Sequence, residues 1–403
     1  MSSLKKHKID KVFLWIVITL LGSGILVFVS ASLSLLEDDP RLFRSVLFNQ
    51  LILGVGLGGL VAYGLSRLHY HVIRNLSFWI FIFGLLLTVT VFIPGLGFSH
   101  GGAQRWISLG PISLQPAEFL KFSTLLYWSA WLSWIGHKRD DMRFSILPLV
   151  IGLTLIAGLL LSQPDTKSLI LITLTTLSLL FISGFSWKKI AVVAVICMTG
   201  FIILASTTPY LKSRIDTFRN PNNDPTGASY QVQQSFIAIG SGGIFGRGFG
   251  KSVQKFGYLP EAQGDSIFAV LGEEMGFLGT SAVVILFIMF FLRGMRISMH
   301  APDEFGRLFT AGVVILLTGQ SFLNIASLTG VFPLTGVPLV FFSHGGTSLF
   351  ITMIMIGIVF NISRYSDMSQ ASFIRTIPEQ INPEEKKTKA KTKTNYQPSK
   401  RKI

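Results

Sequence analysis

The chain has 403 residues, of which 50% are hydrophobic and only 14% are charged, and its formal net charge is +15. Because soluble domains carry roughly 25% charged residues, this composition excludes a chain that folds wholly in water and indicates an integral membrane protein. The positive charge does not indicate nucleic acid as a partner, since it gathers outside the apolar runs. Lys5, Lys6 and Lys11 precede the first run, and ten Lys and Arg residues lie between Arg364 and Lys402, as is typical of cytoplasmic segments next to a membrane.

Ten apolar segments follow one another along the chain and predict membrane-spanning helices. A helix of about 20 residues crosses a hydrocarbon core of roughly 30 Å, and it satisfies its own backbone hydrogen bonds, as lipid requires. The predicted helices cover residues 12–35, 45–66, 77–94, 117–136, 145–162, 167–183, 188–206, 265–292, 307–327 and 345–362. The predicted fold class is therefore an all-α polytopic membrane protein with about ten transmembrane helices.

Basic residues divide unevenly between the two sets of loops. One set holds Arg67, Arg74, Lys138, Arg139, Arg143, Lys188, Lys189, Arg293, Arg296 and Arg307, and the other holds Arg41, Arg44, Arg105 and Lys167. Since cytoplasmic loops carry the excess of Lys and Arg, both termini are expected in the cytoplasm. Residues 1–11 then form a basic cytoplasmic N-terminus, 12–365 the transmembrane domain, and 366–403 a Lys-rich cytoplasmic tail that is expected to be disordered.

Three segments on the outer side are unusual. Residues 95–116 predict a Gly-rich loop, and residues 207–264 predict a large extracytoplasmic loop between helices 7 and 8. The second half of that loop is apolar and Gly-rich, so we expect it to lie in the membrane interface or to fold back against the helices. Residues 330–348 are interrupted by Pro and Gly, and such backbone at membrane depth must line protein or a cavity. We expect this segment to line the same vestibule as Asp265.

Asp265 stands where the large outer loop meets the eighth predicted helix. One interpretation is a helix N-cap, since Asp often accepts hydrogen bonds from the first helical amides. Another is a general base at the outer face, because a helix N-terminus favours the ionised carboxylate, which can accept a proton. The two roles are compatible. Glu261, which lies four residues earlier, could assist this base or orient a substrate hydroxyl.

Further acids lie within predicted helices. Glu273 and Glu274 follow Asp265 in the same helix, where a charge is costly and usually faces protein or a wet cavity, so both structural pairing and function stay open. Glu118 and Lys121 are spaced i,i+3 and can pair. Near Arg105, that pair predicts either a structural salt bridge or a site for an anionic head group. Asp165 predicts a helix cap.

The run from Gly240 to Lys251 ends in Gly-Lys-Ser but does not fit a nucleotide-binding loop. Phe245 stands where the Walker pattern requires glycine. Its glycines, with Arg247, Lys251 and Lys255, could bind a diphosphate through amides and charge, or could form a flexible re-entrant loop. His69 and His71 share a short loop without a third ligand nearby, so no metal site is predicted.

Four segments in this order resemble the characteristic motifs of the SEDS glycosyltransferases, the FtsW/RodA/SpoVE group. They are residues 102–121, 163–165, 235–274 and 330–348. The pieces SLQPAEFLK and QKFGYLPEAQGDSIFAVLGEE are more similar to the division member, FtsW, than to the elongation member, RodA. The resemblance implies a ten-helix enzyme of the bacterial cytoplasmic membrane. That enzyme would polymerise lipid II into peptidoglycan strands at the outer face, in cell division.

The resemblance also implies roles for individual residues. Asp265 matches the essential acid of the family and would deprotonate the 4-hydroxyl of the acceptor GlcNAc. Basic residues, for which Arg105, Lys121 and Arg247 are the candidates, would stabilise the departing undecaprenyl diphosphate, with a divalent cation, Mg²⁺ or Mn²⁺, as an optional addition. The implied substrate-binding set is Glu261, Arg105, Glu118, Lys121, Arg247, Lys251, Ser343 and His344. The implied partners are a class B penicillin-binding transpeptidase with a single membrane anchor and other divisome proteins.

The chain departs from the usual family pattern at several positions. Gln263 and Gly264 replace the usual His-Thr before the acid, and Ser266 replaces the Phe after it. Thr166, Lys167 and Ser168 replace the usual Leu/Phe-Gly-Thr after Pro-Asp, and His344 replaces a Tyr. The acid itself is retained, which favours an enzyme.

Two other functions stay open. A lipid II flippase would need a polar path that reaches both faces, whereas most candidate polar groups here gather at the outer face, which favours chemistry at that surface. A non-catalytic scaffold that recruits a transpeptidase is compatible with the altered motifs.

Overall fold

The computed structural model describes residues 8–100, 103–109, 112–136, 141, 146–219 and 228–366. These residues belong to one compact unit. Residues 1–7 of the predicted cytoplasmic N-terminus and all of the tail after Ser366 lie outside the described residues.

Ten helical passages in the described part of the chain correspond to the ten predicted ones. Those before the large outer segment are α1 (Lys11–Asp38), α2 with the π-helical η1 and α3 (Pro40–Phe48, Asn49–Leu57 and Gly58–Arg67), α4 with the short η2 (Tyr70–Val89 and Thr90–Phe92), α5 (Pro116–Ile135), α7 (Leu147–Ser162), α8 (Thr166–Ile182) and α9 (Trp187–Thr207). Those after it are α12 (Ile267–Met299), α13 (Glu304–Leu328) and α14 (Gly346–Ser363). Seven passages are long and apolar enough to cross a membrane, and α7 and α8 are shorter apolar helices. The predicted polytopic helical fold is confirmed.

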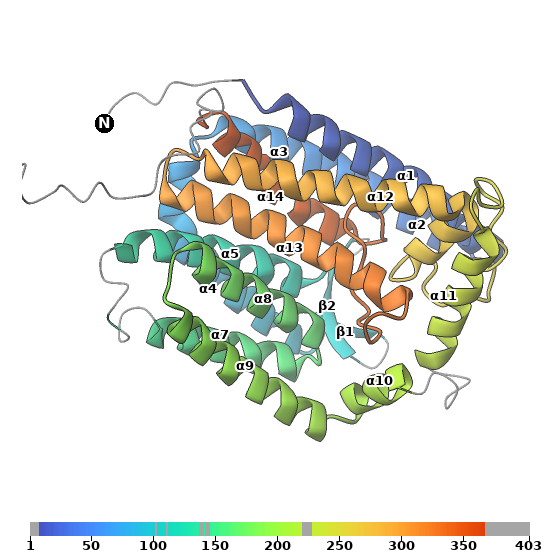
Figure 1. Ribbon diagram of the computed structural model, residues 1–403. Helices are drawn as coiled ribbons and strands as arrows, with labels where there is room; N and C mark the ends of the chain where they lie inside the picture. Colours follow the sequence, from blue (N-terminus) through green and yellow to red (C-terminus); the bar gives the residue numbers. More distant parts are fainter. Residues whose placement is uncertain are drawn as a thin grey trace, which may run out of the picture. The chain divides into compact units, whose positions relative to one another are not determined.

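The centre of the helical unit is formed by α13 and α14. In these two helices 72% and 83% of the most apolar window is buried, whereas the value for α9 is 6%. Helix α14 packs against α3, and α13 packs against α5, α8 and α12 (Figure 1). Helix α9 therefore presents most of its surface to the surrounding lipid, and the buried centre carries the polar groups described below.

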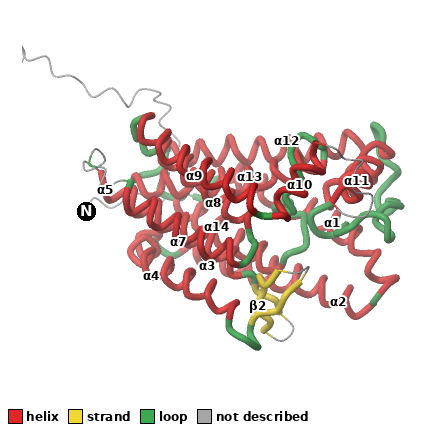
Figure 2. Tube along the Cα trace, turned by 90° about the horizontal axis from the view of Figure 1, so that it is seen from below, coloured by secondary structure: helices red, strands yellow, loops and turns green. Residues whose placement is uncertain are grey.

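The Gly-rich segment 95–116 is not a simple loop, and that prediction was wrong. It forms a three-stranded antiparallel sheet from β1 (Gly97–His100), β2 (Ala103–Leu109) and β3 (Ile112–Leu114), in the order β1-β2-β3. Figure 2 shows the strands in yellow against the helices. The strands are short and bounded by glycines. The alternation of polar and apolar residues that buries Ile107 therefore spans too few residues to predict a strand.

The segment 207–264, predicted as a large extracytoplasmic loop, contains two helices, α10 (Pro209–Arg219) and α11 (Ala228–Gly242). Helix α11 packs on α12, so the expectation that the second half of this segment folds back on the helices is confirmed. In Figure 1 the sheet, α10 and α11 lie toward the right-hand ends of the long helices, and α1 begins at the opposite end.

Helix α12 is broken at Gly276, whose backbone has φ 63° and ψ −161°. The segment after α11 satisfies both broken ends. The amides of Arg247 and Gly248 donate to the carbonyls of Glu273 and Glu274, and the amide of Phe277 donates to the carbonyl of Gly243, each at 2.9 Å. Because backbone groups at a helix break would otherwise lack partners, this interlock fixes the first part of α12, which begins just after Asp265.

Candidate functional site

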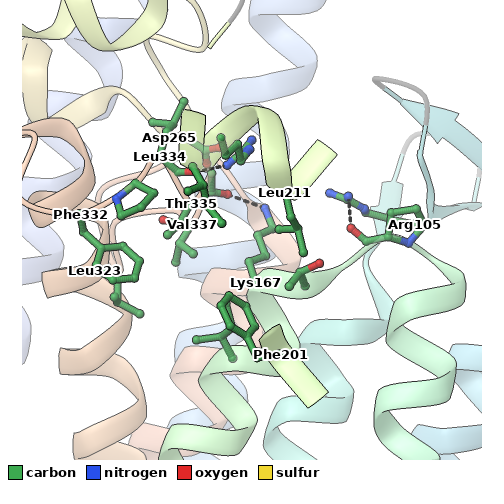
Figure 3. A pocket seen from close by; sticks show the side chains of 17 residues that line it. Arg105, Lys167, Phe201, Leu211, Asp265, Leu323, Phe332, Leu334, Thr335 and Val337 are labelled. Carbon is green, nitrogen blue, oxygen red and sulfur yellow. Dashed lines mark hydrogen bonds between the residues drawn. The ribbon is translucent and has the colours of Figure 1, made fainter. Parts of the chain in front are cut away.

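A cavity of about 210 Å³ lies where the sheet, α10 and the segment between α13 and α14 meet. Most of its lining is apolar, and its ionisable side chains are one carboxylate and three cations. The lining residues are Arg105, Pro164, Thr166, Lys167, Ile170, Phe201, Leu211, Arg214, Ile215, Asp265, Leu323, Phe332, Pro333, Leu334, Thr335, Gly336 and Val337 (Figure 3). Residues 332–337 thus line the same cavity as Asp265, as predicted.

The Asp265 carboxylate faces this cavity and does not cap α12. The cap position belongs to Ser266, and no side chain bonds the first helical amides there, so the N-cap interpretation of Asp265 was wrong. The Ser266 hydroxyl instead donates to the carbonyl of Pro260 at 2.8 Å. Within the described ranges, the Asp265 carboxylate has no hydrogen-bond donor or ion-pair partner, so it remains available to a ligand.

The main chain next to this carboxylate is held firmly. The Asn324 side-chain amide, from α13, donates at 2.7 Å to the carbonyls of both Asp265 and Val337. Asn324 is buried, so these hydrogen bonds are electrostatically stronger than the same bonds would be in water. A single side chain therefore fixes the start of α12 relative to the segment between α13 and α14.

Three ionisable groups converge on Gly336. The Lys167 ammonium donates to the Gly336 carbonyl at 2.6 Å. A methyl group built on Gly336 would lie 3.1 Å from Asp265 Oδ2 and 3.5 Å from Arg214 Nη2. Gly336 also has a φ of +64°, a conformation that only glycine adopts readily. Glycine at this position therefore lets a carboxylate and two cations approach the same point of the backbone.

Lys167 and Arg214 were missed as candidates in the sequence. In the sequence, Lys167 is one of the loop charges and a departure from the family pattern after Pro-Asp, and neither feature predicts a ligand-binding role. Arg214 lies in a polar stretch, but Leu211, Arg214 and Ile215 are spaced i, i+3 and i+4, which places them on one face of a helix. In the structure these three residues of α10 all line the cavity. That spacing is the signal that could have identified Arg214.

Arg105 lines the cavity from strand β2 and lies apart from Asp265 (Figure 3). Its guanidinium donates to the carbonyl of Gln163 at 3.0 Å and to that of Pro164. Asp165, next in the chain, is the predicted cap of α8: it accepts from the Ser168 amide at 3.3 Å and from the Ser168 hydroxyl at 2.7 Å. Arg105 and Asp165 together fix the turn that leads into Lys167.

Glu118 and Lys121 form the ion pair that their spacing predicts, at 2.9 Å. Both side chains are buried in the helical centre and do not line the Asp265 cavity. Lys121 also donates to Gln320 at 3.0 Å, and Ser348 donates to Glu118 at 3.0 Å. The pair therefore joins α5, α13 and α14 below the cavity, and its contact with substrate stays a prediction.

The other basic candidates lie around the break in α12. Arg247 is 3.2 Å from Glu273, whose side chain is fully buried. Lys255 is 2.8 Å from Glu274, with exposures of 0% and 1%. The two glutamates thus have the structural partners that one of the two interpretations above predicted. Lys251 and Glu261 are exposed. Neither these two residues nor Arg247 line the Asp265 cavity.

Ser343 and His344 border a second and much smaller void, together with Gln320. The Ser343 hydroxyl accepts from the Leu339 amide at 2.7 Å. The His344 amide donates to the carbonyl of Gln263 at 2.7 Å, and burial lowers the pKa of its imidazole. Both residues hold the segment between α13 and α14 in place, and their role toward substrate stays a prediction.

The described residues contain no group of three or more His, Cys, Asp or Glu side chains that could hold a metal ion. The cavity itself offers one carboxylate, Asp265. Mg²⁺ is often held by one or two carboxylates and by the phosphates of the substrate, so this donor set fits a divalent cation only together with a phosphorylated ligand.

A family model described as "Cell cycle protein", the FtsW/RodA/SpoVE family, matches residues 11–368. The chain is 34% identical to stage V sporulation protein E of Bacillus subtilis, over 90% of this chain and 99% of that protein. It is 37% identical to the probable peptidoglycan glycosyltransferase FtsW of Trichlorobacter lovleyi, over 88% of this chain and 93% of that protein.

Solved structures show the same architecture. A chain from a structure described as the structural coordination of polymerization and crosslinking by a peptidoglycan synthase complex is 26% identical, with a TM-score of 0.72 over 88% of this chain and 98% of that one. The rod shape determining protein RodA of Thermus thermophilus is 25% identical, with a TM-score of 0.65 over 89% of this chain and 98% of that one. The helices, the cavity and these matches together make the chain a polytopic membrane protein that belongs to the FtsW/RodA/SpoVE family.

Proposed function

We propose that this protein is a peptidoglycan glycosyltransferase that polymerises lipid II at the outer face of the bacterial cytoplasmic membrane, in cell division. Several relatives carry the name "Probable peptidoglycan glycosyltransferase FtsW". The observation that carries the proposal is the Asp265 carboxylate, which faces a cation-lined cavity and has no protein partner within the described residues.

The proposed reaction uses this arrangement as follows. The 4-hydroxyl of the acceptor GlcNAc gives its proton to the Asp265 carboxylate as its oxygen bonds to the anomeric carbon of the donor MurNAc. The bond from that carbon to the diphosphate oxygen breaks on the opposite side, so the configuration inverts, and the electron pair leaves with undecaprenyl diphosphate. A positioned base contributes roughly 10²–10⁴-fold to such a step. Cations near the diphosphate stabilise the charge that develops on it.

A related structure and the distribution of charge in the sequence support the partners and the orientation of the protein. A related structure describes polymerization coordinated with crosslinking, which supports a penicillin-binding transpeptidase as partner, here of class B, with other divisome proteins. The distribution of Lys and Arg supports cytoplasmic termini. A divalent cation, Mg²⁺ or Mn²⁺, would bind to the phosphates of the substrate and neutralise part of their charge.

The test is glycan synthesis from purified lipid II by the reconstituted protein, alone and with its transpeptidase. We expect Asp265→Asn to lower the rate by at least about 10²-fold without changing the thermal unfolding temperature, since this carboxylate makes no contact that supports the fold. Asp216→Asn is the matched control, because Asp216 is exposed on α10 and does not line the cavity. A wild-type rate for Asp265→Asn would exclude Asp265 as the base.

The same protein, reconstituted in vesicles with fluorescent lipid II, tests the transport alternative. A flippase would move the lipid from one leaflet to the other in the Asp265→Asn variant as well. We expect no movement above that of protein-free vesicles.

A further inference from the structure

The three cations of the Asp265 cavity are not equivalent. Arg105 is held by two backbone carbonyls of the turn before α8 and lies apart from the carboxylate (Figure 3). Lys167 and Arg214 instead border Gly336, next to Asp265. We propose that Lys167, with Arg214 beside it, is the cation that binds the diphosphate of the donor substrate. This inference rests on the proposed function and assigns residues that the sequence did not single out.

The Lys167 ammonium has capacity for a ligand. An ammonium group carries three donors, and one of them is bound to the Gly336 carbonyl at 2.6 Å. In the described part of the chain it has no other acceptor, so two donors remain for phosphate oxygens. The bond to Gly336 keeps the long side chain extended at the cavity wall. Lys167 is therefore positioned before the substrate arrives, which lowers the entropy cost of binding.

The electrostatics of the cavity favour an anion at this point. Lys167 lies in the first turn of α8, where the helix dipole disfavours a cation, so the protein accepts an electrostatic cost to hold it there. The cavity lining includes the apolar side chains of Ile170, Phe201 and Leu323, and low polarity strengthens the attraction between a cation and a phosphate. A diphosphate would relieve the repulsion between Lys167, Arg214 and the helix end.

The location of Lys167 also fits the chemistry. The leaving oxygen must lie opposite the attacking hydroxyl across the anomeric carbon, and Asp265 serves that hydroxyl. Lys167 donates to the Gly336 carbonyl at 2.6 Å, and Asp265 Oδ2 would lie 3.1 Å from a methyl group built on the same glycine, so the base and the cation border one site in which the reacting sugar would lie. A cation at the leaving oxygen acts mainly in the transition state, so its loss should lower kcat more than it raises KM.

The first experiment separates the charge of Lys167 from its structural bond. Lys167→Gln retains a donor for the Gly336 carbonyl but removes the charge, and Lys167→Arg retains the charge. We expect Lys167→Gln to lower kcat by about 10²-fold and Lys167→Arg to remain within about tenfold of wild type. Lys212→Gln is the control, since Lys212 is exposed on α10 and lies outside the cavity lining. Its kcat should be unchanged.

The second experiment measures the ligand directly, with inorganic diphosphate as the probe. We expect it to inhibit glycan synthesis, and to bind about tenfold more weakly to Lys167→Gln than to wild type, since one charge-assisted contact is worth roughly that factor. Lys212→Gln should bind it as wild type does. Calorimetric titration of Asp265→Asn, with and without Lys167→Gln, makes the same comparison of diphosphate affinity in a protein that makes no glycan.

Two results overturn the inference. A Lys167→Gln variant with wild-type kcat and wild-type inhibition shows that Lys167 only holds Gly336. Equal losses in Lys167→Gln and Lys167→Arg show that side-chain shape and not charge matters. Either result leaves the proposed role of Asp265 unaffected. The opposite combination is glycan synthesis by Asp265→Asn together with weaker diphosphate binding to Lys167→Gln. It would refute Asp265 as the base but support Lys167 as the diphosphate-binding residue.

Discussion

The Lys255 ammonium lies 2.8 Å from the Glu274 carboxylate, and both side chains are excluded from solvent. Lys255 also donates to the Ser30 hydroxyl and to the Gly250 carbonyl, each at 3.0 Å. The pair thus connects α1, α12 and the outer segment after α11. A buried cation with three acceptors is fully satisfied, which is how a charge is accommodated at such depth.

Loss of one member of this pair should be costly. Lys255→Met leaves the Glu274 carboxylate buried without its cation, and we expect the free energy of unfolding to fall by roughly 3–5 kcal/mol. Lys251→Met is the matched control, because it is the same substitution at an exposed position four residues away, and it should change stability by no more than about 0.5 kcal/mol. Unfolding by heat or SDS in detergent measures both. Equal effects would show that the buried pair does not stabilise the fold.

Two glycines of α11 should respond differently to the same substitution. A methyl group on Gly242 would lie 2.0 Å from the backbone oxygen of Gly272 in α12, whereas one on Gly240 would meet nothing within 4 Å. We expect Gly242→Ala to destabilise the protein by about 1–3 kcal/mol through overpacking. Gly240→Ala should be neutral or stabilising by up to about 1 kcal/mol, since alanine favours helix.

The Gly242→Ala variant also tests how Asp265 is positioned. Displacement of α11 from α12 would move the start of α12, where Asp265 lies, so glycan synthesis should fall together with stability. Full synthesis in a destabilised Gly242→Ala protein would show that the contact between α11 and α12 does not position Asp265.

The orientation in the membrane is testable with the single cysteine of the chain removed. In a Cys197→Ser background, Lys251→Cys should react with a membrane-impermeant thiol reagent added outside intact cells that lack an outer membrane barrier. Lys188→Cys, at the other end of the helical unit, should react only after the membrane is opened. Both positions are exposed in the protein, so a difference in labelling shows on which side of the membrane each position lies. The reverse pattern would contradict cytoplasmic termini.

Local sequence was sufficient to predict the helices. A long apolar run in lipid can adopt few structures, because each of its backbone polar groups must form a hydrogen bond within its own segment. The predicted and observed passages therefore agree closely, as for 307–327 and α13. Breaks and short elements were not predictable in this way. The φ of Gly276 depends on contacts with residues 243–248, which lie far from it in the predicted topology.

The cations of the site were also not predictable from local sequence alone. Among the four ionisable residues of the cavity, Asp265 and Arg105 were singled out in the sequence because they belong to recognisable motifs. Arg247 and Lys121 were equally plausible cations by type, yet buried glutamates, Glu273 and Glu118, bind them elsewhere. Which cation remains for a ligand depends on which acids lie near it in space.

The sequence by itself determined that this protein spans a membrane many times and that Asp265 stands at the start of a helix, because hydropathy and residue type are local properties. The tertiary structure alone decided that Lys167 and Arg214 join Asp265 around Gly336. Those residues come from three distant parts of the chain, and the electrostatic interaction between them depends on separations that only packing sets.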